Sequence, residues 1–271
     1  MASVQPVLTD RQIRERAYYD EYVRRRARRV VSFAPVLGRE RRPWNAYWRV
    51  FELARDLFAA GARRLLDFGS GDGGSALLFA RIGYEVDGFD ISEANVTLAR
   101  ELAEQYGLAD RTRFSVQAAE RLEYPDESFD VVVGMDILHH VELRRAVGEC
   151  LRVLKPGCPA IFHEPVEAPV FDPLRNSRLG RWLVPKEASF ERHVTEDERK
   201  LTPADIAAIR AMCPDLTLEP YLLLSRLDRF VRYPRRLRWS PLERLDQVAF
   251  DAVPVVRRFA GKVMLQLSKP A

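Results

Sequence analysis

The sequence predicts an α/β fold in which a seven-stranded, mostly parallel sheet carries helices on both faces. From residue 63 onward, short apolar runs alternate with amphipathic segments of helical length, a pattern typical of βαβ units. Several glycines follow the first apolar run, as in turns that lead from a strand into a helix. The composition, 47% hydrophobic and 30% charged residues, is that of a globular protein, and no apolar run reaches the length of a membrane-spanning helix.

Five strands and the helices between them are expected in residues 63–164, the predicted core. The expected strands are 63–69, 84–90, 111–117, 129–136 and 159–165. The helix after the second strand has the clearest signals, because Ser92 can cap it, Glu93 stands in its first turn and Gly107 ends it. The sequence therefore predicts a parallel sheet whose helices connect consecutive strands.

The residues before this core are expected to be helical and to cover it. Residues 1–62 should form an N-terminal helical lid with one helix at 10–30 and a second at 43–60. Asp10 can cap the first helix, and Pro43 is a favourable residue at the start of the second.

The residues after the core, 165–271, are expected to form a substrate cap or insertion together with the last sheet strands. Those strands are predicted at 216–224 and 262–268, with mainly helical residues at 240–261. Residues 165–200 hold four prolines and do not fit the strand–helix alternation. A loop of that length in a compact domain is usually functional, such as a lid or a substrate wall.

The first strand leads into a turn that combines an acid with glycines, Asp67-Phe68-Gly69-Ser70-Gly71-Asp72-Gly73-Gly74. Glycines permit a tight turn and let the backbone approach a ligand at a helix N-terminus. Asp90 ends the second strand, at the same edge of the predicted sheet, where a carboxylate can accept the hydroxyls of a ribose. These features together indicate a nucleoside site.

Two nucleoside cofactors compete for this site. Gly69, Gly71 and Gly74 satisfy the dinucleotide fingerprint G-x-G-x-x-G, which alone is a weak signal. Asp67, two residues before the first glycine, favours S-adenosylmethionine instead, because a carboxylate there can pair with the ligand's ammonium group. A nicotinamide-dependent oxidoreductase would leave Asp67 unexplained and usually carries a Tyr-x-x-x-Lys pair, which is missing here.

Five motifs that follow one another along the chain favour S-adenosylmethionine over a nicotinamide dinucleotide. The sequences LLDFGSGDGG, VDGFDIS, AAERLEYPDESFDVVVGMDILHHV, LRVLKPG and AIFHEP resemble those of the class I S-adenosylmethionine-dependent methyltransferases, whose fold is Rossmann-like. The closest branch looks like the small-molecule methyltransferases of ubiquinone and menaquinone biosynthesis. By this resemblance the cofactor-binding residues are Asp67, Gly69, Ser70, Gly71, Gly73, Asp90, Ile91, Ala118, Ala119, Glu120 and Met135. The family often has an aspartate for the adenine amine where this chain reads Ala118-Ala119-Glu120.

Methyl transfer needs the acceptor held in line with the methyl carbon and the sulfur, and a hydroxyl acceptor also benefits from a base. The candidate catalytic residues are His140, His163, Glu164 and His193. His140 is the preferred base and oxygen the preferred acceptor atom. No metal is implied, because the three cysteines form no C-x-x-C pair.

Both flanks of the chain are basic, which bears on its partners. Residues 1–42 hold 11 arginines and 5 acids, and residues 224–262 hold 10 basic and 4 acidic residues. A small-molecule substrate is expected, and a peripheral contact of the C-terminal basic segment with anionic membrane is an alternative to a substrate cap or plain packing. Unpaired cysteines and the lack of a secretory signal predict a cytoplasmic location. The oligomeric state does not follow from the sequence.

Other functions remain open on the same fold. A methyltransferase acting on RNA would use the basic flanks, but the N-P-P-Y tetrapeptide of base-amine methylating enzymes is missing. A lipid-linked acceptor is compatible with the basic segment. A non-methylating relative that only holds the cofactor is the remaining alternative.

Overall fold

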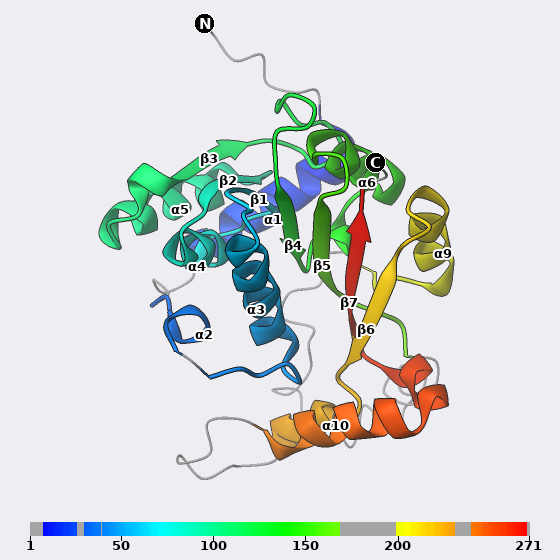
Figure 1. The fold of residues 1–271 in the computed structure, drawn as a ribbon. Helices are drawn as coiled ribbons and strands as arrows, with labels where there is room; N and C mark the ends of the chain where they lie inside the picture. Colours follow the sequence, from blue (N-terminus) through cyan, green and yellow to red (C-terminus); the bar gives the residue numbers. More distant parts are fainter. Residues whose placement is uncertain (1–7, 26–29, 39, 169–198, 231–239, 270–271) are drawn as a thin grey trace, which may run out of the picture.

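The computed structural model describes residues 8–25, 30–38, 40–168, 199–230 and 240–269. Its centre is a seven-stranded sheet of order β3-β2-β1-β4-β5-β7-β6 (Figure 1). The strands are β1 (Arg64–Phe68), β2 (Glu85–Asp90), β3 (Thr112–Val116), β4 (Val131–Met135), β5 (Pro159–Pro165), β6 (Thr217–Tyr221) and β7 (Lys262–Ser268). The first five are parallel, and β7 runs antiparallel between β5 and β6. The predicted fold class is confirmed.

Helices lie before, between and after these strands along the chain. They are α1 (Asp10–Arg25), α2 (Ala34–Leu37), α3 (Ala46–Ala59), α4 (Gly74–Ile82), α5 (Glu93–Gln105), α6 (Leu143–Val153), α9 (Pro203–Met212) and α10 (Pro241–Ala252), with 3-10 turns η1 (Ala109–Arg111), η2 (Leu138–His140), η5 (Ser225–Phe230) and η6 (Pro254–Phe259). Figure 1 shows α10 lying beyond one end of β6 and β7. None of the helices in the described ranges is both long and apolar enough to cross a bilayer.

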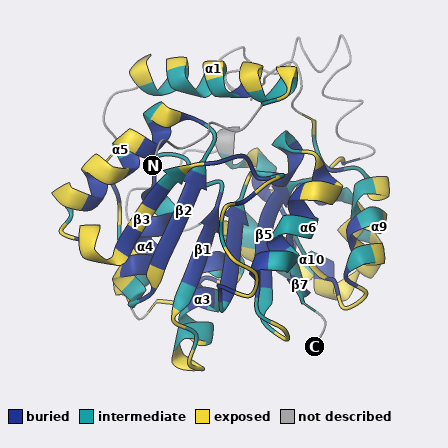
Figure 2. Cartoon of the chain, turned by 90° about the horizontal axis from the view of Figure 1, so that it is seen from above, coloured by how far each residue is buried: buried dark blue, intermediate teal, exposed yellow. Residues whose placement is uncertain are grey.

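Each face of the sheet packs into its own hydrophobic cluster. Leu65, Val133 and Ile161 pack with α3, α4 and α5 on one face, whereas Phe68 and Phe162 pack with α6 and α9 on the other. Successive strand residues point to opposite faces, so the central strands are buried along their length (Figure 2). This alternation also fixes which face each polar residue at a strand end takes.

Some predicted boundaries differ from the structure. The second helix begins at Ala46 rather than at Pro43, because the side chain of Asn45 accepts a hydrogen bond from the backbone N–H of Trp48 at 3.0 Å and caps the helix there. The short helix α2 was not expected. The strand predicted at 216–224 ends at Tyr221, before Leu222 takes a left-handed conformation at φ 63°.

Candidate active site

The glycine turn after β1 lies at the carboxyl edge of the parallel strands. It ends at Gly73, the N-cap of α4, which has a φ of +78°, and a Cβ there would lie 2.6 Å from the Cβ of Ala99. Gly71 also has a positive φ, +51°, but a Cβ on it would meet nothing within 4 Å. Gly73 is therefore required by packing, whereas Gly71 borders open space in which a ligand can approach the backbone.

Asp67 is held beneath this turn. Strand alternation turns its side chain to the face of α4, where Ser75 donates a hydrogen bond to its carboxylate at 2.7 Å. The residue is 1% exposed, and this burial raises the pKa of Asp67 to about 7, even though the hydrogen bonds from Ser75 and the backbone of Ala76 lower it. An ammonium group beside this carboxylate would favour its ionised form.

Asp90 at the end of β2 organises the neighbouring loops. Its Oδ2 accepts the backbone N–H of Gly71 at 3.0 Å, and its Oδ1 accepts the N–H of Ser92 at 2.9 Å and the side-chain amide of Asn95 at 3.1 Å. A carboxylate offers about four acceptor positions. These three donors leave room on Oδ2 for a ligand hydroxyl.

The other predicted cofactor residues lie along the same edge. Ser70 is buried and bonds to the carbonyl of Phe89 through its backbone N–H at 2.7 Å and its hydroxyl at 3.3 Å, so it ties the turn to β2. Ala118 and Ala119 are buried just after β3, while Ile91 and Met135 are partly exposed. The carboxylate of Glu120 is engaged by Gln12 at 2.7 Å and by the backbone N–H of Glu142 at 2.9 Å.

Helix α1 spans this edge and contacts three of its loops. Besides the bond from Gln12, Asp20 accepts the hydroxyl of Ser92 at 2.6 Å and the backbone N–H of Ala94 at 3.2 Å. At η2, the ring of His140 lies between Glu15, 3.4 Å from Nδ1, and the hydroxyl of Tyr19, 3.3 Å from Nε2. Nothing in the sequence around Glu15 or Asp20 indicated these contacts.

The four candidate bases take different places. Three of the four, His140, His163 and Glu164, lie in the described ranges. Among these three, only His140 contacts α1. Glu164 is fully buried, and its carboxylate accepts the backbone N–H groups of Ile137 and Leu138 and contacts Nδ1 of His139 at 2.7 Å. His163 points to the opposite face of β5, and burial lowers its pKa to about 4. His193 lies outside the described residues.

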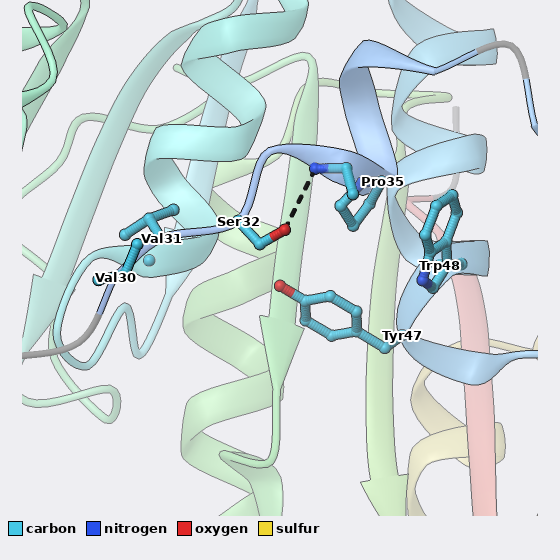
Figure 3. Close-up of a pocket in the computed structure, with 8 residues that line it drawn as sticks. Val30, Val31, Ser32, Pro35, Tyr47 and Trp48 are labelled. Atoms are coloured by element: carbon cyan, nitrogen blue, oxygen red, sulfur yellow. Dashed lines mark hydrogen bonds between the residues drawn. The ribbon is translucent and has the colours of Figure 1, made fainter. Parts of the chain in front are cut away.

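A hollow of about 220 Å³ lies beside the start of α4. Its lining includes Gly74, Ser32 and Pro35 and, from the first turn of α3, Tyr47 and Trp48. Figure 3 shows the ring of Tyr47 reaching from α3 toward Ser32, with valines on the far side. A lining that combines apolar side chains with two hydroxyl groups suits a small organic molecule better than a charged polymer.

The described part of the chain contains no cluster of three or more acidic, histidine or cysteine side chains that could hold a metal ion. Asp90 accepts the backbone N–H of Gly71, which borders open space, and Asp67 lies beneath the same turn, an arrangement that fits a ligand with both an ammonium group and a ribose.

Comparison with known proteins agrees with this geometry. Residues 66–162 match a family model described as a methyltransferase domain. Over 140 residues the chain is 34% identical to a ubiquinone biosynthesis O-methyltransferase from Roseobacter denitrificans, a match that covers 50% of this chain and 55% of that relative. The chain thus spans about half the length of the curated relative.

Two solved structures share the fold almost end to end. The [4+2]-cyclase SpnF is 22% identical with a TM-score of 0.57, and the match covers 98% of each chain. A geranyl diphosphate C-methyltransferase from Streptomyces coelicolor A3(2), solved with Mg²⁺, geranyl diphosphate and S-adenosyl-L-homocysteine, is 15% identical with a TM-score of 0.60, over 97% of this chain and all of that one. At these identities the likeness shows the fold alone.

Proposed function

Since the chain belongs to the class I S-adenosylmethionine-dependent methyltransferases, we propose that it transfers a methyl group from this cofactor to an oxygen of a small-molecule acceptor. The observation that carries the proposal is the pair of aspartates at the glycine turn: Asp90 accepts the backbone N–H of Gly71, which borders open space, and Asp67 is held by Ser75 beneath the turn. The match to a family that uses S-adenosylmethionine sets the nicotinamide alternative aside.

Each part of the site has a proposed task. S-adenosylmethionine, when bound, supplies a methyl group that its sulfonium has already activated. Asp67 would pair with the ammonium group, Asp90 would accept a ribose hydroxyl, and Ala118, Ala119, Glu120, Ile91 and Met135 would border the adenosine. The hollow at Tyr47 would hold the acceptor, and Asp20, Tyr19 and Glu15 would hold α1 over the edge as a lid.

His140 is proposed as the base. Glu15 beside Nδ1 would orient the ring, and Nε2, which faces the hydroxyl of Tyr19, would take the proton from an acceptor hydroxyl. His163, with its lowered pKa, is a poor base near neutral pH. Both oxygens of Glu164 are engaged by the turn that carries His140, so we assign Glu164 to positioning that turn.

Titration calorimetry tests the proposed cofactor. S-adenosylhomocysteine should bind to the purified chain, and NADH should not. Because the cofactor's ammonium favours ionised Asp67, whose pKa is about 7, binding below that pH releases a proton, and affinity should rise by up to about tenfold per pH unit until roughly pH 7 and then level off. Binding of NADH in place of S-adenosylhomocysteine would refute the proposal.

A variant of His140 tests the transfer step. With an acceptor found by screening phenols and sugars, His140→Gln should lower kcat by about 10²- to 10⁴-fold, the usual contribution of a general base, and leave the affinity for S-adenosylhomocysteine unchanged. Full turnover in the variant would reject the role of His140. A wild-type chain that binds the cofactor but releases no S-adenosylhomocysteine with any acceptor would instead be a non-methylating relative, as the shared fold of the [4+2]-cyclase allows.

A cytoplasmic location and a peripheral contact with membrane stay predictions. Part of the basic segment that suggested membrane contact, residues 231–239, lies outside the described ranges.

A further inference from the structure

The sheet order separates the cofactor from its acceptor. Apart from Met135 at the end of β4, the residues proposed for the cofactor stand at the carboxyl ends of β1, β2 and β3, on one side of the point where the strand order reverses. The acceptor must therefore meet the methyl group over β4, β5 and the neighbouring end of β7. A polar cluster that the catalytic assignment does not use lies there.

The first two members of this cluster are an ion pair that bridges β4 and β7. Because β7 is antiparallel, its first residue, Lys262, lies opposite Pro165 at the carboxyl end of β5. The Nζ of Lys262 is 2.9 and 3.2 Å from the two carboxylate oxygens of Asp136, the residue after Met135. About half of the Asp136 side chain and a quarter of the Lys262 side chain are exposed, at 49% and 26%.

The third member is the imidazole of His163. Its backbone carbonyl accepts the N–H of Asp136 at 2.9 Å, and its Cα pairs with Met135 in the sheet. The residue is only 6% exposed, yet its Nε2 has no hydrogen-bond partner among the described residues. A buried ring nitrogen without a partner costs free energy unless a ligand completes it.

Building on the proposed function, we propose that Asp136, His163 and Lys262 form a subsite that binds an uncharged hydroxyl of the acceptor, of the phenol class. The hydroxyl enters the ion pair, donates its proton in a hydrogen bond to Asp136, and accepts one from the ammonium of Lys262. His163 supplies a further polar partner at the buried side. The aromatic hollow at the same sheet edge, lined by Tyr47 and Trp48, suits the ring that carries such a hydroxyl.

The charges of the cluster select this chemical class. Burial and the nearby Lys262 lower the pKa of His163 to about 4, so its ring is neutral at pH 7. Lys262 holds the pKa of Asp136 below its ordinary value against the opposing effect of burial, so the pair is ionised and its net charge is zero. A carboxylate would be repelled by Asp136 and an ammonium by Lys262, whereas a hydroxyl can satisfy both partners.

Two simple probes test the selection, 4-methylphenol and 4-methylbenzoate, titrated at pH 7 into the chain with and without saturating S-adenosylhomocysteine. The wild type should bind the phenol at least tenfold more tightly than the benzoate. Asp136→Asn, which leaves Lys262 as an unbalanced cation, should reverse this preference. Asparagine is also well tolerated at the φ of 54° that Asp136 adopts, so the variant should fold.

Two lysine variants complete the design. Lys262→Met should weaken the binding of 4-methylphenol at least tenfold. Lys269→Met is the matched control, since Lys269 forms a similar ion pair with Glu127, at 3.1 Å, next to the opposite end of β7. An unchanged preference in Asp136→Asn, an equal loss in Lys269→Met, or no phenol binding to the wild type would overturn the subsite. Failure of S-adenosylhomocysteine to bind would count against the proposed function instead, because the probes are also titrated without it.

Discussion

Replacing Asp90 with alanine should weaken the binding of S-adenosylhomocysteine by about 100-fold. A hydrogen bond to a charged group contributes about 1.5–3 kcal/mol, and 1.4 kcal/mol corresponds to tenfold in affinity. The substitution removes the acceptor of the proposed ribose hydroxyl. It also frees the backbone N–H of Gly71, so the glycine turn loses one of its hydrogen bonds to β2. Titration calorimetry measures the change directly.

An aspartate at the opposite edge of the sheet, directly before β4, provides the control for this variant. Asp130 accepts the backbone N–H groups of Arg63 and Arg64 at 2.9 and 2.8 Å and pairs with Lys155 at 2.6 Å, but it lies at the opposite edge of the sheet. Asp130→Asn should reduce stability while leaving cofactor affinity within a factor of about two. If Asp90→Ala bound as tightly as the control, Asp90 would have no part in the cofactor site.

Much of the cofactor site follows from local sequence pattern. Apolar runs bounded by glycines and acids mark β1, β2 and β4, and parallel strands bring their carboxyl ends to one edge. Asp67, Gly71 and Asp90 could therefore be placed together without coordinates. Ser92 caps α5 by accepting the N–H of Asn95 at 3.1 Å. This cap was equally predictable from the sequence, because capping depends on residues three positions apart.

The acceptor side depends on contacts that local pattern does not encode. The final strand was expected, but its direction was not, and a parallel β7 would have put Lys262 at the far edge from Asp136. The contact between Gln12 and Glu120 joins residues 108 positions apart. Alternation within β5 does show that His163 and Glu164 face opposite sides, yet only the packing of α6 and η2 decides which face each one takes.

Glu164 illustrates how burial separates a positioning residue from a base. Its side chain is fully buried on β5, and its carboxylate accepts the backbone N–H groups of Ile137 at 2.9 Å and Leu138 at 2.8 Å and contacts Nδ1 of His139 at 2.7 Å. These three groups belong to the turn between β4 and α6. That turn includes Asp136, in its left-handed conformation, and His140.

Glu164→Ala should therefore lower the free energy of unfolding by about 3–5 kcal/mol, the usual cost of removing one partner from a buried charged network. Urea denaturation measures this loss, and Glu142→Ala is the control, because the exposed pair of Glu142 with Arg145 should contribute at most about 1 kcal/mol. Glu164→Gln keeps the volume and one carbonyl acceptor, so it should retain part of both the stability and the turnover. A base would behave in the opposite way, since glutamine would preserve stability while abolishing turnover, and that result would return Glu164 to the chemistry.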